Sequence, residues 1–167
     1  WLKVALNASQ ILANIPQGSK YREAEGRHWC NLGRSYQNTL EERGDTIACL
    51  ERALSIAREC HVLPDEALAL GNLGVVYRDR GELDRAEDFF RKRYDLAEQL
   101  DDGHGRTNTM GNLGQIFLKR KDFAHALEFF NKQLSMARDL GFRHLEGQAL
   151  GNKGQVILGL GDIPNAI

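Results

Sequence analysis

The sequence repeats itself at a fixed interval of 40 residues. The tetrapeptide Gly71-Asn72-Leu73-Gly74 returns as Gly111-Asn112-Leu113-Gly114, and a variant with lysine in third place occupies residues 151–154. Matched residues further along include Phe89 and Phe129. A period of this length indicates a solenoid of stacked supersecondary units, in which no unit buries its apolar face alone. This repeat constrains the fold more than composition does.

Each unit is predicted to contain two amphipathic helices joined by a short turn. In residues 67–79, and again from 83 to 100, apolar side chains recur at three- and four-residue spacing. Gly81 lies between these two patterns and suits the left-handed residue that ends a helix. In the next unit Lys121 takes the place of that glycine, so we expect a left-handed lysine there, at a cost of about 1 kcal/mol. Asp122 follows it and is expected to cap the next helix.

Three further expectations concern the local structure of the units. Glu82 occupies the capping position of the earlier unit and should cap less well than an aspartate. Gly114 is expected to face Ala126, so that the two helices approach closely. In the first unit the wide spacing from Gly33 to Gly44 predicts a first helix that continues through residues 37–43 and a shorter second helix.

The first unit reads Trp29-Cys30-Asn31-Leu32-Gly33-Arg34-Ser35-Tyr36. Its Trp, Leu-Gly and Tyr at the spacing W-x2-L-G-x2-Y resemble the signature of the tetratricopeptide repeat, and the resemblance covers residues 19–167. The 40-residue unit is similar to that of the Pins-type (Partner of Inscuteable) cell-polarity adaptors and to arrays in many bacterial signalling proteins. The resemblance implies an all-α fold, a right-handed superhelical solenoid of antiparallel helix pairs.

The repeat register also predicts how the chain is divided. Neither end carries the polar cap that closes natural arrays, so we expect an internal part of a longer array. The predicted segments are a helix of a preceding repeat at 1–18, repeats at 19–61, 62–101 and 102–141, and an incomplete fourth repeat at 142–167.

The same resemblance implies where a ligand binds. In such arrays the first helix of each pair lines an inner groove, and a peptide lies along it. The predicted peptide-binding residues are the repeated asparagines, the residues that follow Leu-Gly, and residues one turn away: Asn31, Arg34, Asn72, Asn112, Gln115, Asn152, Gln155, Arg27, Arg78 and Asn108. Asp79, Lys119 and Gln148 should face the same way.

The residue types in this set favour peptide recognition. Carboxamides donate and accept hydrogen bonds together, so a ladder of Asn and Gln can hold a peptide backbone whatever its side chains. Arginine adds bidentate capture of carboxylates. A second interpretation stays open, in which each repeated asparagine bonds the backbone of a neighbouring repeat and sets the repeat spacing. The two roles can coexist. For Arg27, Arg34 and Arg78 the alternative is an ordinary solvated helix face.

Several other functions are disfavoured by charge and by the absence of motifs. The net charge is −1 and the basic residues are scattered, whereas nucleic acids and anionic membranes need a basic stripe. No apolar run reaches the roughly 18–20 residues of a membrane span. The five histidines are dispersed and no HExxH, GxSxG or GxxxxGK[ST] motif occurs, so we expect no catalytic site, no metal and no cofactor.

Two smaller features have structural interpretations. The segment Asp101-Asp102-Gly103-His104-Gly105 lacks the ligand alternation of a calcium loop, so it is interpreted as a turn between repeats. Cys30, Cys49 and Cys60 form no CxxC pair, and reduced thiols in a cytoplasmic protein are expected.

Two functional hypotheses remain. The first is a protein–protein interaction scaffold that binds a peptide segment of a partner in the concave groove. The second is a sensor or regulatory arm of a larger signalling ATPase or protease, whose partner is a domain of the same protein. Recognition of RNA by a helical-repeat code is disfavoured because the sequence has no basic track.

Overall fold

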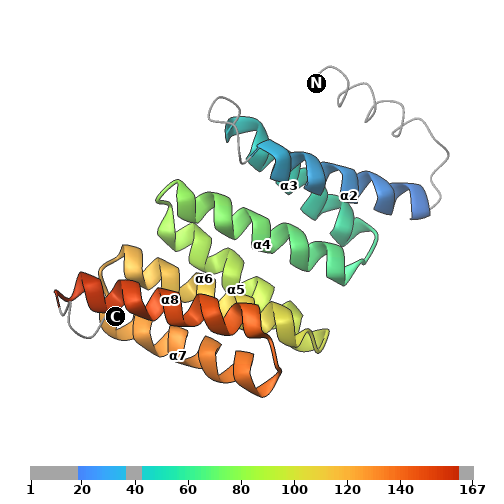
Figure 1. Ribbon diagram of the computed structural model, residues 1–167. Helices are drawn as coiled ribbons and strands as arrows, with labels where there is room; N and C mark the ends of the chain where they lie inside the picture. The colour runs from blue at the N-terminus through green and yellow to red at the C-terminus, as the bar shows by residue number, and fades with distance from the viewer. Residues whose placement is uncertain (1–18, 37–42, 162–167) are drawn as a thin grey trace. The chain divides into compact units, whose positions relative to one another are not determined.

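The computed structural model describes residues 19–36 and 43–161, which form seven α-helices and no strand. From α3 onward a helix of 17 residues begins every 20 residues, so each 40-residue period holds one helix pair. The prediction of an all-α helical-repeat fold is confirmed, while the repeat boundaries stay a prediction. The helices are α2 (Ser19–Tyr36), α3 (Arg43–Glu59), α4 (Leu63–Asp79), α5 (Leu83–Gln99), α6 (Gly103–Lys119), α7 (Phe123–Asp139) and α8 (Arg143–Gly159) (Figure 1).

The connections between successive helices from α3 to α8 share one backbone design. In each three-residue turn the middle residue has a positive φ, and Lys121 adopts this conformation with a φ of 60°, as predicted. Its N–H donates to the carbonyl of Leu118 at 3.0 Å, and the N–H of Asp122 donates to the carbonyl of Phe117 at 2.9 Å. This pair of bonds is the Schellman motif, which satisfies carbonyls at the end of a helix. Adjacent helices can therefore fold back on one another.

The last residue of each turn is the N-cap residue of the helix that follows. Asp122 accepts a bond from the backbone N–H of His125 at 3.2 Å, and Glu82 makes no side-chain cap bond, so both predictions are confirmed. Asp102 caps α6 by accepting a bond from the N–H of Gly105 at 2.8 Å. In the segment 101–105, Asp101 and Asp102 form the expected turn between helices, whereas residues 103–105 are the first residues of α6.

The chain divides into two compact units, Trp1–Val76 and Tyr77–Ile167, and each is described by itself. In the first unit α2 packs against α3. Leu50 is fully buried there, and an ideal Cβ placed on Gly33 would lie 2.8 Å from its Cγ. Glycine at this position therefore allows the two helices to approach closely.

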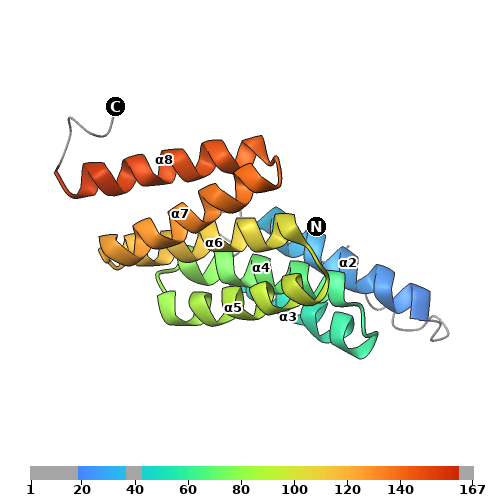
Figure 2. The same cartoon turned by 90° about the horizontal axis from the view of Figure 1, so that it is seen from below.

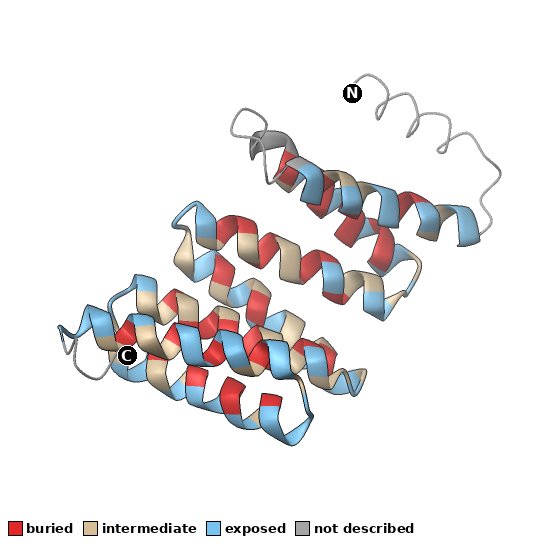
Figure 3. Cartoon of the chain, viewed as in Figure 1, coloured by how far each residue is buried: buried red, intermediate tan, exposed pale blue. Residues whose placement is uncertain are grey.

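In the second unit α6 packs against α5 and α7, and α7 packs against α8 (Figure 2). Helix α6 also contacts α8 directly. The buried residues lie on the faces that the helices turn toward one another, and the exposed ones face outward (Figure 3). Ala126, Phe130 and Val156 form a core cluster, against which Phe117 and Phe123 pack.

Two local predictions were wrong. The side chain nearest to Gly114 is the ring of Phe130, not Ala126, because an ideal Cβ would meet three atoms of that ring first. The second helix of the first pair is not shortened, since α3 begins at Arg43 and has the same 17 residues as its successors. The predicted helix in residues 1–18 lies outside the described residues, as do residues 37–42 of the predicted extension. Arg43, the last residue of that predicted extension, begins α3 instead.

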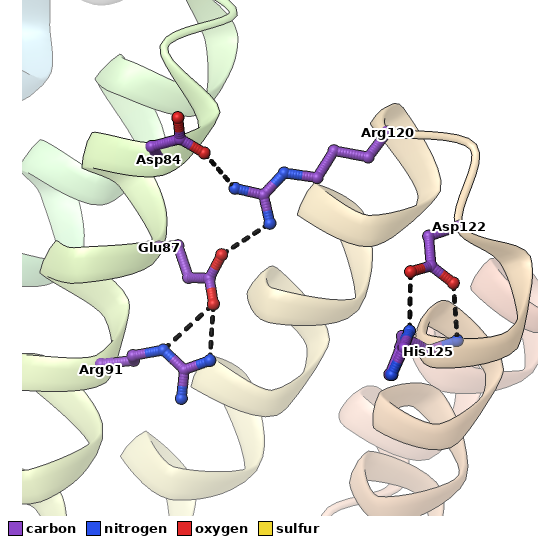
Figure 4. Close-up of polar contacts among 6 residues, drawn as sticks. All are labelled: Asp84, Glu87, Arg91, Arg120, Asp122 and His125. Atoms are coloured by element: carbon purple, nitrogen blue, oxygen red, sulfur yellow. Dashed lines mark hydrogen bonds and ion pairs between the residues drawn. The ribbon is translucent and has the colours of Figure 1, made fainter.

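Ion pairs on the outer face link α5 to α6. Arg120, at the end of α6, bonds to Asp84 and to Glu87, and Glu87 also receives bonds from Arg91 (Figure 4). Partial burial is the largest influence on the pKa of Glu87 and acts to raise it, but the two guanidinium groups outweigh it and hold the pKa below its usual value. This network holds neighbouring helices together.

Candidate functional site

A groove of about 220 Å³ opens on the second unit, between the last turn of α4 and helices α6 and α8. Within α6 the lining positions recur at spacings of three and four residues, so they share one face of the helix. The repeat register places the α8 contributors at matching positions one period later. The lining consists of Arg78, Asp79, Asn108, Gly111, Asn112, Gln115, Lys119, Gln148 and Asn152.

Hydrogen bonds order the carboxamides of the groove. Arg78 donates through Nη1 to Oδ1 of Asn112 at 2.8 Å, and Asn112 donates through Nδ2 to Oδ1 of Asn108 at 3.0 Å. On the α8 side, Gln115 donates through Nε2 to Oδ1 of the buried Asn152 at 2.7 Å. Each amide is thus held in one orientation by its neighbour, with further donor and acceptor capacity left at the same groups.

The charges in the lining are two cations and one carboxylate. Arg78 is paired with Asp79, whose oxygen lies 2.9 Å from Nη2, and the Asp79 side chain is 58% exposed. Because the Asp79 carboxylate is exposed to solvent, a ligand carboxylate can compete with it for Arg78, whose own side chain is 18% exposed. Lys119 is exposed at the other end of the α6 face. The lining as a whole therefore favours an anionic group over a cationic one.

The structure brings five predicted site residues together in this groove. They are Asn108, Asn112, Gln115, Asn152 and Arg78, each of which lines the cavity. Asp79, Lys119 and Gln148 line it too, in the orientation expected from their register.

Gln155 is exposed on α8 and is not part of the lining. Sequence reasoning missed Gly111 as a lining residue, and it also missed Gln133 of α7, which lies against Gly111. A polar residue among the apolar positions of α7 was the signal that could have found Gln133.

The remaining four predicted residues belong to the first unit. Asn72 of α4 donates to the Sγ atom of Cys30 at 3.3 Å, while Arg27 lies 3.6 Å from Asp65. Burial is the main reason why the pKa of the Cys30 thiol is raised, although the bond from Asn72 acts in the opposite direction. Asn31 and Arg34 are exposed on α2.

Three of the repeated asparagines bond a side chain of the preceding first helix. Asn72 contacts Cys30, and its repeat equivalents Asn112 and Asn152 contact Arg78 and Gln115. These bonds fit the role in repeat spacing that was one of the two interpretations, although they reach side chains rather than backbone. They leave the role in ligand contact open.

Other kinds of site find no support in the described parts of the chain. Residues 19–36 and 43–161 contain no group of three or more His, Cys, Asp or Glu side chains arranged to hold a metal ion. None of the helices described there has both the length and the apolar character required to cross a membrane.

Comparison with known proteins identifies the repeat. The family model of the tetratricopeptide repeat matches residues 24–99 and 65–139. A search of curated proteins finds no match to this chain.

Similar solved structures come from several kinds of protein. Aspartyl phosphate phosphatase F from Bacillus subtilis has a TM-score of 0.84 at 17% identity, over 99% of this chain and 42% of that one. A putative kinesin light chain from Podospora anserina has a TM-score of 0.74 at 12% identity, over 98% and 79%.

A signal-transduction ATPase with a tetratricopeptide repeat sensor, from Pyrococcus horikoshii, has a TM-score of 0.69 at 14% identity, over 93% of this chain and 26% of that one. The chain thus spans less than half of the phosphatase and about a quarter of the ATPase. At these identities the likeness shows the fold alone.

Proposed function

Because this chain belongs to the tetratricopeptide repeat family, we propose that it is a protein-interaction scaffold whose groove binds an extended segment of a partner protein. The single observation that carries this proposal is the groove lining of the second unit, where five carboxamide side chains lie beside Arg78 and Lys119. An extended peptide presents alternating N–H and C=O groups, and carboxamides can bond both.

The pre-ordered amides favour binding for an energetic reason. Asn112 is held between Arg78 and Asn108, so little side-chain entropy is lost when a ligand binds to it. The bound segment should carry at least one acidic residue, because the lining holds two cations and one exposed carboxylate. We propose that this residue lies near Lys119.

The first unit is proposed to contribute contacts of the same kind. Asn31 and Arg34 are exposed on α2 and free to meet a ligand, and Arg27 is more than half exposed beside Asp65. Asn72, already bonded to Cys30, would act as the counterpart of Asn112. Gln155 is proposed as a peripheral contact on α8.

The proposal is tested with peptides selected from a random dodecapeptide display library on the purified chain. Dissociation constants of synthetic copies would be measured by isothermal titration calorimetry. Asn112→Ala removes one or two hydrogen bonds and should weaken binding about five- to tenfold. Lys119→Glu reverses an exposed charge and should weaken acidic peptides by a similar factor.

Lys92→Glu supplies the matched control. Lys92 is exposed on α5 and does not line the groove, so the same charge reversal there should leave peptide affinity unchanged. Circular dichroism would establish that all three variants fold. Selection of no peptide, or equal loss of affinity in Lys92→Glu and Lys119→Glu, would contradict the proposal.

A second candidate is a sensor or regulatory arm of a larger signalling protein. The observation that favours it is the fold similarity to a repeat sensor that forms part of a signal-transduction ATPase. In that case the groove is occupied by a domain of the same protein. Selected peptides should then bind this chain but not the intact polypeptide, and equal affinity for both would argue against this candidate.

A further inference from the structure

Behind the groove lies a buried amide that the peptide proposal does not use. Gln133 of α7 has no exposed surface, and its Nε2 donates to Oε1 of Gln148 at 3.1 Å. Its own Oε1 is buried and has no hydrogen-bond partner. An ideal Cβ on Gly111 would lie 2.5 Å from Nε2 and 2.8 Å from Oε1 of Gln133. The amide of Gln133 therefore lies directly behind two residues of the groove lining, Gly111 and Gln148.

An orphaned oxygen of this kind needs an explanation. A buried acceptor without a partner loses its bonds to water and gains nothing in return, so native structures contain few of them. Local violations of this rule tend to occur at functional sites, where a ligand supplies the missing bond. Gln133 is the only side chain outside the arginines with such an atom in the described part of the chain.

The residue type at this position differs from one repeat to the next. One period earlier stands Arg93, which is paired with Asp102 at 2.9 Å. Two periods earlier stands Ala53, which is buried. An amide at this position is therefore particular to the repeat that lies beside the groove.

We propose that Gln133 and Gln148 form a carboxamide-selective subsite at the edge of the groove, which takes the side chain of an Asn or Gln residue in the bound segment. The bond between the two amides leaves the Gln133 oxygen as an acceptor and the Gln148 nitrogen as a donor. A primary carboxamide carries both complementary groups, so it can satisfy the two together. Leu offers neither group and Glu lacks the donor.

Access to the subsite runs past Gln148. This side chain is exposed on α8, so it is not held by close packing and can shift to admit the ligand. Gln133 cannot shift in the same way, because it is enclosed by its neighbours. Gln133 thus acts as the fixed member of the pair and Gln148 as the movable one.

The inference rests on the proposed peptide groove, and the experiment separates the two. The probe is a positional-scanning library of hexapeptides with acetylated N-termini and methylamide C-termini, so that no terminal carboxamide competes. Peptides that differ only by Gln, Glu or Leu at the preferred position would be titrated into the wild type. We expect Gln to bind about tenfold more tightly than Glu or Leu, and Gln133→Met to reduce that ratio below about threefold.

Two further variants keep the result interpretable. Gln148→Leu alters an exposed residue and should also abolish the preference, so it replaces Gln133→Met if that variant does not fold. Asn131→Met, at an exposed position of α7, makes the same kind of change and should retain the preference. Thermal unfolding of Gln133→Met should show no loss of Tm, because the variant removes an unpaired buried oxygen.

Each outcome supports or overturns the subsite. Loss of the Gln preference in Gln133→Met with a retained Tm supports it. Equal weakening of all peptides in that variant, or a wild type without preference while binding still depends on Asn112 and Lys119, overturns the subsite alone. Failure of every hexapeptide to bind the wild type overturns the subsite and the proposed groove together.

Discussion

Gly114 of α6 lies against the ring of Phe130 of α7, and an ideal Cβ on Gly114 would stand 2.5 Å from Cε1 of that ring. Phe130 is fully buried, so it cannot move aside without disturbing the core cluster that it forms with Ala126 and Val156. We expect Gly114→Ala to lower the free energy of unfolding by about 1–3 kcal/mol, as overpacking does elsewhere. Urea unfolding followed by circular dichroism measures this change.

Gly147 of α8 provides the matched control for that experiment. It is also a helical glycine, but an ideal Cβ there would meet no atom within 4 Å. Gly147→Ala should therefore raise the free energy of unfolding by about 0.5–1 kcal/mol, the usual difference between the two residues in a helix. Changes of the same sign in both variants would show that close packing does not explain Gly114.

Lys121 adopts a left-handed backbone conformation that suits glycine better than lysine. Its φ is 60°, whereas glycine (Gly81 and Gly141) holds the same position in two of the other turns. Lys121→Gly should raise the free energy of unfolding by about 1 kcal/mol, because it removes the left-handed strain. The greater freedom of glycine in the unfolded chain should reduce this gain by a few tenths of a kcal/mol. The reverse change, Gly141→Lys, should lower it by a similar amount. A thermal melt of each variant tests the pair.

The helix caps allow a third comparison between equivalent positions. Asp122 caps α7 through the N–H of His125, but Glu82 makes no side-chain cap bond to α5. Asp122→Ala should lower the midpoint of urea unfolding, and Glu82→Asp should raise the free energy of unfolding by about 0.5–1 kcal/mol by supplying the missing bond. The ion pair of Glu82 with Arg85 is exposed and its loss matters little. No gain in the midpoint of urea unfolding for Glu82→Asp would contradict this account.

These positions show what could be predicted from sequence. The left-handed conformation of Lys121 and the cap of Asp122 depend on residues within one turn, and a fixed period makes their alignment with Gly81 and Glu82 unambiguous. The shared face of Asn112 and its neighbours follows from helix geometry in the same way. Local rules therefore determine the turns and which residues share a helix face, whereas the resemblance to tetratricopeptide arrays indicated that this face lines a groove.

The features that the sequence did not predict depend on which side chains of neighbouring helices contact one another. The partner of Gly114 was expected to be Ala126 and is Phe130, because the offset between α6 and α7 is decided by packing rather than by spacing along the chain. The burial of Gln133 has the same origin, since its neighbours Gly111 and Gln148 come from two other helices. Sequence reasoning placed residues on faces, but it did not predict which faces touch.

Asp102 gives the chain a predictable response to acid. Partial burial is the largest influence on its pKa and acts to raise it, but the N–H of Gly105 and the guanidinium of Arg93 together outweigh burial and hold the pKa below its usual value. A depressed folded-state pKa means that this carboxylate contributes stability above its unfolded pKa of about 4. The contribution is lost as the pH falls through the lower, folded value.

Asp102→Asn isolates this contribution, because asparagine caps a helix about as well as aspartate does. At pH 7 the variant loses the charged bond to Arg93 and should be about 1 kcal/mol less stable than the wild type. As the pH falls below the unfolded pKa of about 4 and then through the lower, folded-state pKa, the wild-type carboxylate takes up its proton and the two stabilities should converge. Urea unfolding at a series of pH values, with Asp88→Asn as a control for the loss of one negative charge on an exposed face of α5, measures this convergence. A difference between wild type and Asp102→Asn that stays constant from pH 7 to pH 2 would mean that the pairing with Arg93 contributes nothing to the stability of the fold.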